Sequence, residues 1–327
     1  MKDFKVSVGI WFLGATSDRF VKGGYRPDNT IEERFKMVGG IEGAGGLEMH
    51  YPTEVTDANY KDLKALANDL SLEIVQFCPH LWVDPKFKFG QFTNSDPKLR
   101  QEALDLAKRT TDVAQYMQAH VMVYWPAQDG YDYPFQIDHR AALDHLVENL
   151  AAWCDHNPQQ KIVVEYKAWE PRARILLPTI GHCMTIVNEI NRPNFGVNID
   201  MGHALMMKEN LAESISLCCR YGKLYHTHWN DNWKLFDDDI IVGTVNLWET
   251  LEALFWLEEW GYDGWFGLDL FPYREDPVAV VRETIANLKF GYELLDRVPR
   301  EELCETMHTY DAIKISQLMR RMLGGQA

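Results

Sequence analysis

Eight short segments rich in apolar and β-branched residues recur along this chain of 327 residues, and each is followed by a stretch with helix signals. The segments cover residues 5–12, 46–50, 73–79, 120–125, 161–166, 195–200, 223–229 and 265–270. Regular alternation of strands and helices favours a parallel sheet, and eight such units favour a sheet that closes on itself. The sequence therefore predicts a (β/α)₈ TIM barrel, whose functional side chains follow the carboxyl ends of the strands.

Local signals predict where the helices lie. Thr30 and Glu33 have the spacing of a capping box, and Asp96 precedes a proline at a predicted helix start. Apolar residues recur at helical spacing over 97–118, 138–154, 175–190, 208–221, 246–260 and 276–297. The sequence then becomes a charged helical stretch, so we expect a barrel over 1–298 and a short helical C-terminal tail over 299–327.

Charge and composition exclude several classes of protein. The 48 acidic and 33 basic residues leave a net charge of −15, which argues against a general nucleic-acid binder. No apolar run approaches the roughly 18 residues of a membrane helix, and the first residues lack the pattern of a signal peptide. The six cysteines show no C-x-x-C pair or zinc-ligand spacing, so we expect them reduced in a cytoplasmic protein.

Ligand-type residues follow four consecutive predicted strands, the fifth to the eighth. They are Glu165, Asp200, His228 and Asp269. Each alone is explained as well by a solvated or capping side chain, but four at equivalent places indicate a metal site at the barrel mouth. Carboxylate oxygens together with imidazole suit Mn²⁺, Mg²⁺ or Co²⁺ better than a thiolate-bound metal.

A second group of candidate ligands lies close to the first in sequence. His203 follows Asp200 by three residues, and a loop after the seventh strand carries Asp237 and Asp239. Three aspartates in a row are also compatible with a solvated loop, but gathered carboxylates repel one another unless a cation joins them. We therefore predict two divalent cations per subunit, with Asp200 bridging them.

Further residues at the predicted strand ends suit a sugar pocket. Lys167 lies two positions beyond Glu165, so both side chains face the barrel mouth. A lysine there is usually a salt-bridge partner, but two neighbouring dications would repel it, so we predict a polar or electrophilic role. Trp11, Trp82 and Trp125 also follow strands. Aromatic walls are often part of a core, but in a polar pocket they stack on sugar faces and exclude water.

Five sequence blocks resemble xylose isomerase of the short, actinobacterial type. They are DPKFKFGQFTNSDPKLRQEALDLAKRTTDVA (84–114), EYKAWEPRARILLPTIGH (165–182), RPNFGVNIDMGH (192–203), GKLYHTHWNDNWKLFDDDIIVG (222–243) and GYDGWFGLDLFPYRED (261–276). The resemblance covers roughly residues 5–297, and the joint occurrence of these blocks is highly specific. It implies a TIM barrel that interconverts an aldose and a ketose with two divalent cations.

The resemblance also implies a role for each matching residue. The first cation would be held by Glu165, Asp200, His228 and Asp269, and the second by Asp200, His203, Asp237 and Asp239. Lys167 would hydrogen-bond the migrating carbonyl, and Asp237 would help to position the second cation while a hydroxyl proton is removed. The sugar pocket would be lined by Trp11, Trp82 and Trp125.

Two more residues take their expected roles from the same resemblance. His50 would bind the ring oxygen and help to open the pyranose. Phe20 would reach into the site of a neighbouring subunit, which implies a homo-oligomer, either a dimer or a tetramer.

The chain departs from the xylose isomerase pattern at several positions. Asp200 stands where that family has glutamate, and His228 where it has aspartate; both replacements resemble L-rhamnose isomerase. The aspartate that orients the ring-opening histidine is missing after His50, and Glu54 is the candidate substitute. Most of the long carboxyl-terminal arm is also missing. These departures favour a sugar other than D-xylose, such as D-apiose or a rare deoxy sugar.

The sequence thus predicts a metal-dependent aldose–ketose isomerase that acts on a pentose or deoxy sugar by a hydride shift, with no nucleic-acid or membrane partner. One alternative is a sugar 3-epimerase or keto-inositol enzyme of the same superfamily, which needs two acid/base carboxylates and usually one metal. A non-catalytic sugar-binding barrel is another. A metal-dependent endonuclease needs a basic groove and a third metal, and the net charge disfavours it.

Overall fold

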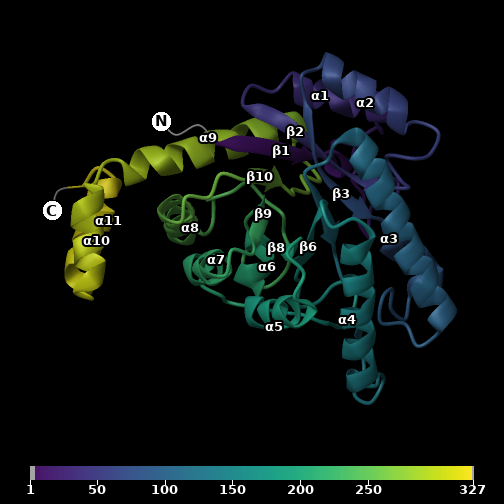
Figure 1. The fold of residues 1–327 in the computed structure, drawn as a ribbon. Coiled ribbons are helices and arrows are strands. Elements are labelled where there is room, and N and C mark those ends of the chain that lie inside the picture. The colour runs from purple at the N-terminus through teal and green to yellow at the C-terminus, as the bar shows by residue number, and fades with distance from the viewer. Residues whose placement is uncertain (1–3, 326–327) are drawn as a thin grey trace.

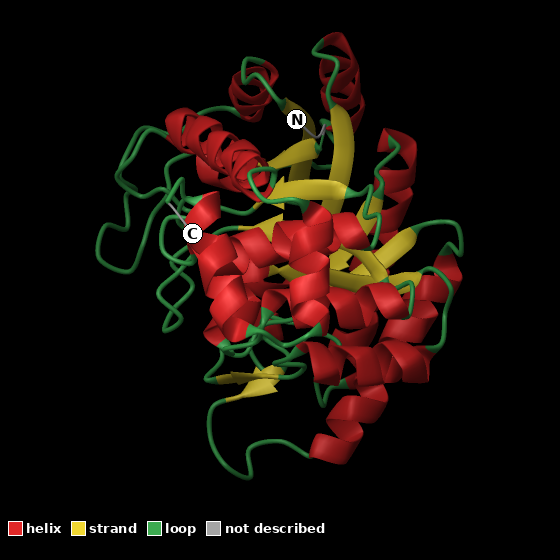
Figure 2. Ribbon diagram, turned by 90° about the vertical axis from the view of Figure 1, so that its left-hand side faces the viewer, coloured by secondary structure: helices red, strands yellow, loops and turns green. Residues whose placement is uncertain are grey.

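The computed structural model describes residues 4–325 and forms a closed parallel barrel surrounded by helices (Figures 1 and 2). The barrel strands are β1 (Lys5–Gly9), β2 (Ala44–Tyr51), β3 (Glu73–Pro79), β4 (Val121–Tyr124), β6 (Lys161–Glu165), β8 (Phe195–Asp200), β9 (Leu224–Trp229) and β10 (Trp265–Leu268). They follow one another around the barrel in the order β1-β10-β9-β8-β6-β4-β3-β2. The predicted TIM barrel is confirmed.

Helices cover the outside of this barrel (Figure 1). They are α1 (Ile31–Gly39), α2 (Tyr60–Asp69), α3 (Pro97–Met117), α4 (His139–His156), α5 (Ile180–Ile190), α6 (Met201–Met206), α7 (Leu211–Arg220), α8 (Leu247–Glu259) and α9 (Pro277–Leu295). The predicted capping box forms at α1, where Thr30 accepts a hydrogen bond from the Glu33 amide and Glu33 accepts one from the Thr30 amide. The Asp96 side chain caps α3 in the same way, by accepting from the amide of Lys98.

Several local structures differ from the expectations. Residues Ile10–Leu13 form a short 3-10 helix instead of continuing the first strand. The stretch before α5 is not helical: β7 (Arg174–Ile175) pairs there with β5 (Gly130–Tyr131) in a small antiparallel sheet. Helix α2 was not predicted because only Leu63 and Ala67 are buried on it, which is too few apolar positions to show a helical period.

The predicted helical tail is present as α10 (Arg300–His308) and α11 (Ala312–Met322), which lie beside the end of α9 (Figure 1). Leu318 and Met322 of α11 pack in a small apolar cluster with Leu251 of α8 and Leu294 of α9. This contact gives the tail a defined place on the barrel, while the boundary after residue 298 stays a prediction.

The structure also bears on two expectations drawn from composition. All six cysteines are free, and four of them are buried, in agreement with the absence of paired spacings. Among residues 4–325, none of the helices has the length and apolar character needed to cross a membrane. The cytoplasmic location stays a prediction.

Candidate metal and sugar site

A cavity of about 460 Å³ opens at the carboxyl ends of the barrel strands. The strand order explains how distant residues meet there: Glu165 ends β6, Asp200 ends β8, and His228 lies opposite Asp200 on the paired strand β9. Asp269 directly follows β10. The predicted site residues that line the cavity are Trp11, His50, Trp82, Trp125, Glu165, Lys167, His203, His228, Asp237, Asp239 and Asp269.

The structure brings the four residues of the first predicted group together. Glu165, Asp200, His228 and Asp269 each place a possible ligand atom within 4.8 Å of the others. The Nδ1 atom of His228 lies 3.1 Å from a Glu165 oxygen, 3.6 Å from Asp269 and 3.8 Å from Asp200. This buried nitrogen nevertheless makes no hydrogen bond of acceptable geometry. An imidazole nitrogen without a partner, surrounded by three carboxylates, fits a divalent cation between them.

A second group shares Asp200 with the first and adds His203 and Asp237. Asp200 caps the short helix α6 by accepting a hydrogen bond from the His203 amide, and His203 lines the same cavity. The intervening glycine is required here, because a Cβ at Gly202 would lie 2.0 Å from the Asn230 side-chain oxygen. The His203 Nδ1 and the Asp237 Oδ1 atoms are also buried without hydrogen bonds, so this group fits a cation as well.

Asp239 is placed differently from the other predicted ligands. It lines the same cavity, but its carboxylate does not belong to the group formed by Asp200, His203 and Asp237. Burial, followed by the charges of Asp237 and Asp269, raises the pKa of Asp239 well above its usual range. Its role as a ligand of a second cation stays a prediction.

Burial and mutual repulsion disfavour the ionised form of two of these carboxylates. Burial raises the pKa of Asp200, and burial together with the charges of Glu165 and Asp200 raises the pKa of Asp269 to about 7, although His228 acts in the opposite direction. The pKa of Glu165 is lowered despite its burial, because His228 and His203 face it. A bound divalent cation would stabilise the ionised form of all these groups.

Lys167 is buried at the edge of the second group. Its Nζ atom donates hydrogen bonds to Asp237 over 2.8 Å and to Glu170 over 2.9 Å. Burial alone would lower the pKa of Lys167, but the charges of these two carboxylates and of Asp239 outweigh burial and raise it. Lys167 is therefore a charged group that shares Asp237 with His203, whose Nε2 atom lies 3.1 Å from the same oxygen.

Aromatic rings form one wall of the cavity. Trp82 packs edge-on against Trp125 with ring centroids 4.6 Å apart, and Trp11 lies 4.8 Å from the ring of His50. The indole nitrogen of Trp11 donates a hydrogen bond to Asp269 over 3.0 Å. Such a wall, apolar on its faces and anchored at a polar edge, suits a sugar ring or chain.

Glu54, the candidate substitute for the missing aspartate, lies beside His50. One of its oxygens accepts a hydrogen bond from the His50 amide over 2.8 Å and lies 3.1 Å from the ring Nδ1 atom. Burial would raise the pKa of Glu54, but the neighbouring His50 outweighs it and lowers this pKa to about 2. Glu54 is therefore ionised and contacts the His50 imidazole at its Nδ1 atom.

The sequence analysis missed one histidine of this wall. His80 stacks on His50 with ring centroids 4.4 Å apart, and burial together with His50 lowers the pKa of His80 to about 3. The available signal was its position directly after β3, a strand end like those of the other site residues.

Phe20 lies outside the cavity lining and is 77% exposed. Its expected place in the site of a neighbouring subunit, and with it the homo-oligomer, stays a prediction. An aromatic ring this exposed is consistent with burial by another chain.

Residues 40–290 match the model of the family described as "Xylose isomerase-like TIM barrel". The chain belongs to this family. It is 29% identical to the xylose isomerase of Thermus thermophilus over 282 residues, which cover 80% of this chain and 71% of the relative. The resemblance inferred from the five blocks is therefore confirmed.

Solved structures with the same fold include several sugar epimerases. A D-tagatose 3-epimerase-like protein superposes with a TM-score of 0.66 at 20% identity, covering 90% of this chain and 100% of that protein. An L-ribulose 3-epimerase gives a TM-score of 0.69 at 13% identity, covering 89% of this chain and 96% of that protein. At these identities the likeness shows the fold alone.

Proposed function

We propose that this member of the family is a divalent-metal-dependent aldose–ketose isomerase that acts on a pentose or deoxy sugar. The observation that carries the proposal is the position of Asp200, which belongs to both groups of candidate ligands and so supports two neighbouring cation sites. Aromatic rings and a charged lysine stand over these sites in one cavity. The similarity to a xylose isomerase supports the same reaction class.

The donor set determines which cations fit. Glu165, Asp200, His228 and Asp269 would hold the first, and Asp200, His203 and Asp237 would hold the second, with Asp239 beside it. Oxygen and imidazole donors suit Mn²⁺, Co²⁺ or Mg²⁺. When bound, such cations hold neighbouring sugar oxygens and polarise the carbonyl as Lewis acids.

The residues above the cations complete the proposed reaction. The ammonium group of Lys167 would donate a hydrogen bond to the carbonyl oxygen, where negative charge increases as hydride arrives. Asp237 and Asp239 would accept the proton that leaves the neighbouring hydroxyl, and the former carbonyl oxygen would take up a proton as it becomes the new hydroxyl. Trp11, Trp82 and the rest of the aromatic wall would exclude water, so that the hydrogen passes directly between the two carbons.

Replacing Glu54 by glutamine is expected to slow the opening of a pyranose by about tenfold or more, since positioned acid–base groups typically contribute at least that much. The cause is the loss of the negative charge that holds His50. The measurement is turnover of the substrate sugar beside turnover of a four-carbon aldose, which cannot form a pyranose.

Only the pyranose-forming sugar should be slowed in this variant. Thr53→Ala is the matched control, because Thr53 contacts His80 rather than His50. An equal loss of rate with both sugars would contradict a ring-opening role for His50 and Glu54.

A sugar 3-epimerase is the second candidate function, and one contact favours it. The ion pair between Lys167 and Asp237 occupies a ligand of the second site, which would leave one cation at the first group. Glu165 and Asp269 would then be the two acid/base carboxylates. A panel of aldoses and ketoses with Mn²⁺, Co²⁺ or Mg²⁺, followed by NMR and elemental analysis, separates the candidates: an isomerase binds two cations, an epimerase one, and a sugar-binding barrel turns over none of the sugars.

A further inference from the structure

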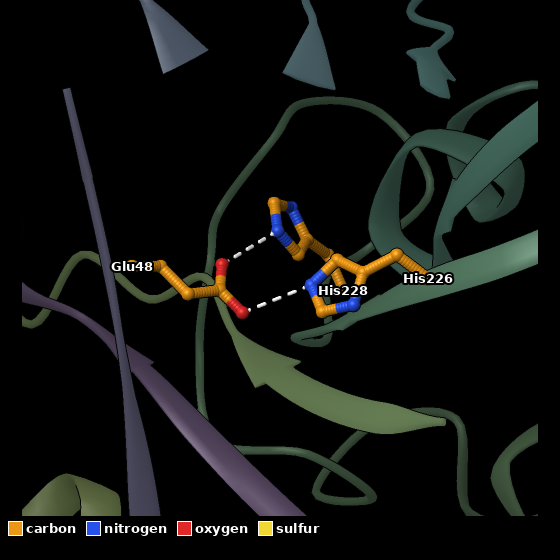
Figure 3. A group of neighbouring side chains, drawn as sticks. All are labelled: Glu48, His226 and His228. Carbon is orange, nitrogen blue, oxygen red and sulfur yellow. Dashed lines mark hydrogen bonds and ion pairs between the residues drawn. The ribbon is translucent and has the colours of Figure 1, made fainter. Parts of the chain in front are cut away.

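Glu48 is a fully buried carboxylate of β2 that the sequence analysis did not single out. Figure 3 shows its carboxylate facing two imidazoles of β9, with each oxygen joined to one of them by a dashed line. The carboxylate accepts hydrogen bonds over 2.9 Å from the Nε2 atoms of His226 and His228, and over 2.5 Å from the Ser7 hydroxyl. Only His228 of these residues belongs to the first cation group.

The barrel provides the space that this contact needs. Strands β1 and β10 lie between β2 and β9, so the Glu48 side chain must cross them inside the barrel. Ser7, Gly267 and His228 are aligned in register on β1, β10 and β9. A Cβ at Gly267 would lie 2.4 Å from the Glu48 oxygen and 2.8 Å from His226 Nε2, so the glycine leaves the crossing open.

The hydrogen bonds determine where His228 carries its proton. An ionised carboxylate only accepts hydrogen bonds, so the Nε2 atom of His228 must be the donor. The neutral imidazole then has its lone pair on Nδ1, the atom that faces Glu165, Asp200 and Asp269 and makes no hydrogen bond of its own.

We propose that Glu48 is a positioning residue, which holds His228 in the Nε2–H tautomer and keeps Nδ1 as the ligand atom for the first cation. The inference rests on the proposed function, since it requires a cation at the first group. His226 and Ser7 hold the other Glu48 oxygen, so the carboxylate cannot turn away from His228.

Glutamine at position 48 tests this arrangement with almost no change of volume. The oxygen that accepts from both Ser7 and His226 has two donors, so the carbonyl of Gln is favoured on that side. The NH₂ group of this glutamine then faces the Nε2 atom of His228. Both groups are donors and repel each other unless the proton of His228 moves from Nε2 to Nδ1. That tautomer cannot present a lone pair to the cation.

The experiment measures cation affinity by calorimetry and the ring ¹⁵N shifts of His228 by NMR, both with Mg²⁺, for wild type and Glu48→Gln. We expect affinity at the first group to fall by about 10- to 100-fold, the range typical of residues that orient a ligand histidine. We also expect the ¹⁵N shifts to report a proton on Nδ1. Ser7→Ala is the matched control: the carboxylate is kept and His226 still donates to the same oxygen, so both readouts should stay close to wild type.

A conservative variant guards against loss of folding. If Glu48→Gln is insoluble, Glu48→Asp keeps an acceptor-only group and should preserve the Nε2–H tautomer with intermediate affinity. Wild-type affinity and ¹⁵N shifts in Glu48→Gln would overturn the inference, and so would a third bound cation that this variant loses, because Glu48 would then be a ligand itself. Wild-type protein that binds no cation would instead refute the proposed function.

Discussion

Excess chelator is expected to abolish turnover and to lower the melting temperature by about 5 °C or more, and Mn²⁺ or Co²⁺ should restore both. The reason is the group of buried carboxylates around Asp200. Burial raises the pKa of Asp200, and burial with the charges of Glu165 and Asp200 raises the pKa of Asp269, so their ionised forms are costly until a cation binds. A cation at 100 times its dissociation constant stabilises the folded state by about 2.7 kcal/mol, so two such cations contribute about 5.4 kcal/mol. With an unfolding entropy of about 2.1 cal/mol/K per residue, each kcal/mol shifts the midpoint of this 327-residue chain by about 1.5 °C. Calorimetry of the chelated and reloaded protein measures the shift.

The same experiment has a pH dependence with a definite sign. Below the raised pKa of Asp269, about 7 through burial and neighbouring carboxylates, a proton competes with the cation for this group. The gain in melting temperature on adding Mn²⁺ should therefore shrink as the pH falls from 8 to 6. Full turnover in excess chelator, with the absence of metal confirmed by elemental analysis, would contradict the account.

Asp200→Asn is expected to lower cation affinity at both sites by more than about 100-fold, beyond the loss typical of residues that only support a ligand. Asp200 is the residue that the two groups share, so no other single substitution among these ligands removes a charge from both. Turnover should fall as well, because the proposed reaction needs the second cation that this variant no longer holds. Asparagine keeps the cap of α6, because it accepts from the His203 amide as aspartate does.

Asp237→Asn is the matched variant for this test. Its carboxylate belongs to the second group alone, so it should weaken the second cation and leave the first nearly unchanged. Titration calorimetry of both variants separates the two effects. If Asp200→Asn still bound two cations with unaltered affinity, Asp200 would not be shared.

The barrel and the first group of ligands were predictable because both depend on local patterns. Strand and helix signals alternate visibly, and the carboxyl ends of parallel strands meet at one edge, so Glu165, Asp200, His228 and Asp269 had to lie close together. The capping box at Thr30 was predictable for the same reason, since all its atoms lie within one helical turn.

The rest of the site depends on contacts between distant residues. The ion pair of Lys167 with Asp237 joins two residues that are 70 positions apart in the sequence. Asp237 lies on a loop whose path the sequence does not specify. The contact of Glu48 with His228 could not be predicted from the sequence, because it depends on the register of β1, β10 and β9. That register places Gly267 between the two side chains and leaves space for Glu48. The loop near residue 91 is similarly held by the buried Asp129, which accepts from the Gln91 and Thr93 amides.

We propose that hydrogen passes directly between neighbouring sugar carbons, in a cavity whose aromatic wall would exclude water from the reacting atoms. The most direct test runs the reaction in D₂O, with the sugar that the panel identifies, and follows the product by proton NMR at early turnover. A direct transfer predicts product with essentially no deuterium bound to carbon. Substantial deuterium at the reacting carbon would show that a carboxylate such as Glu165 or Asp269 had held the hydrogen as an exchangeable proton, and would contradict the hydride shift in favour of an epimerase-like mechanism.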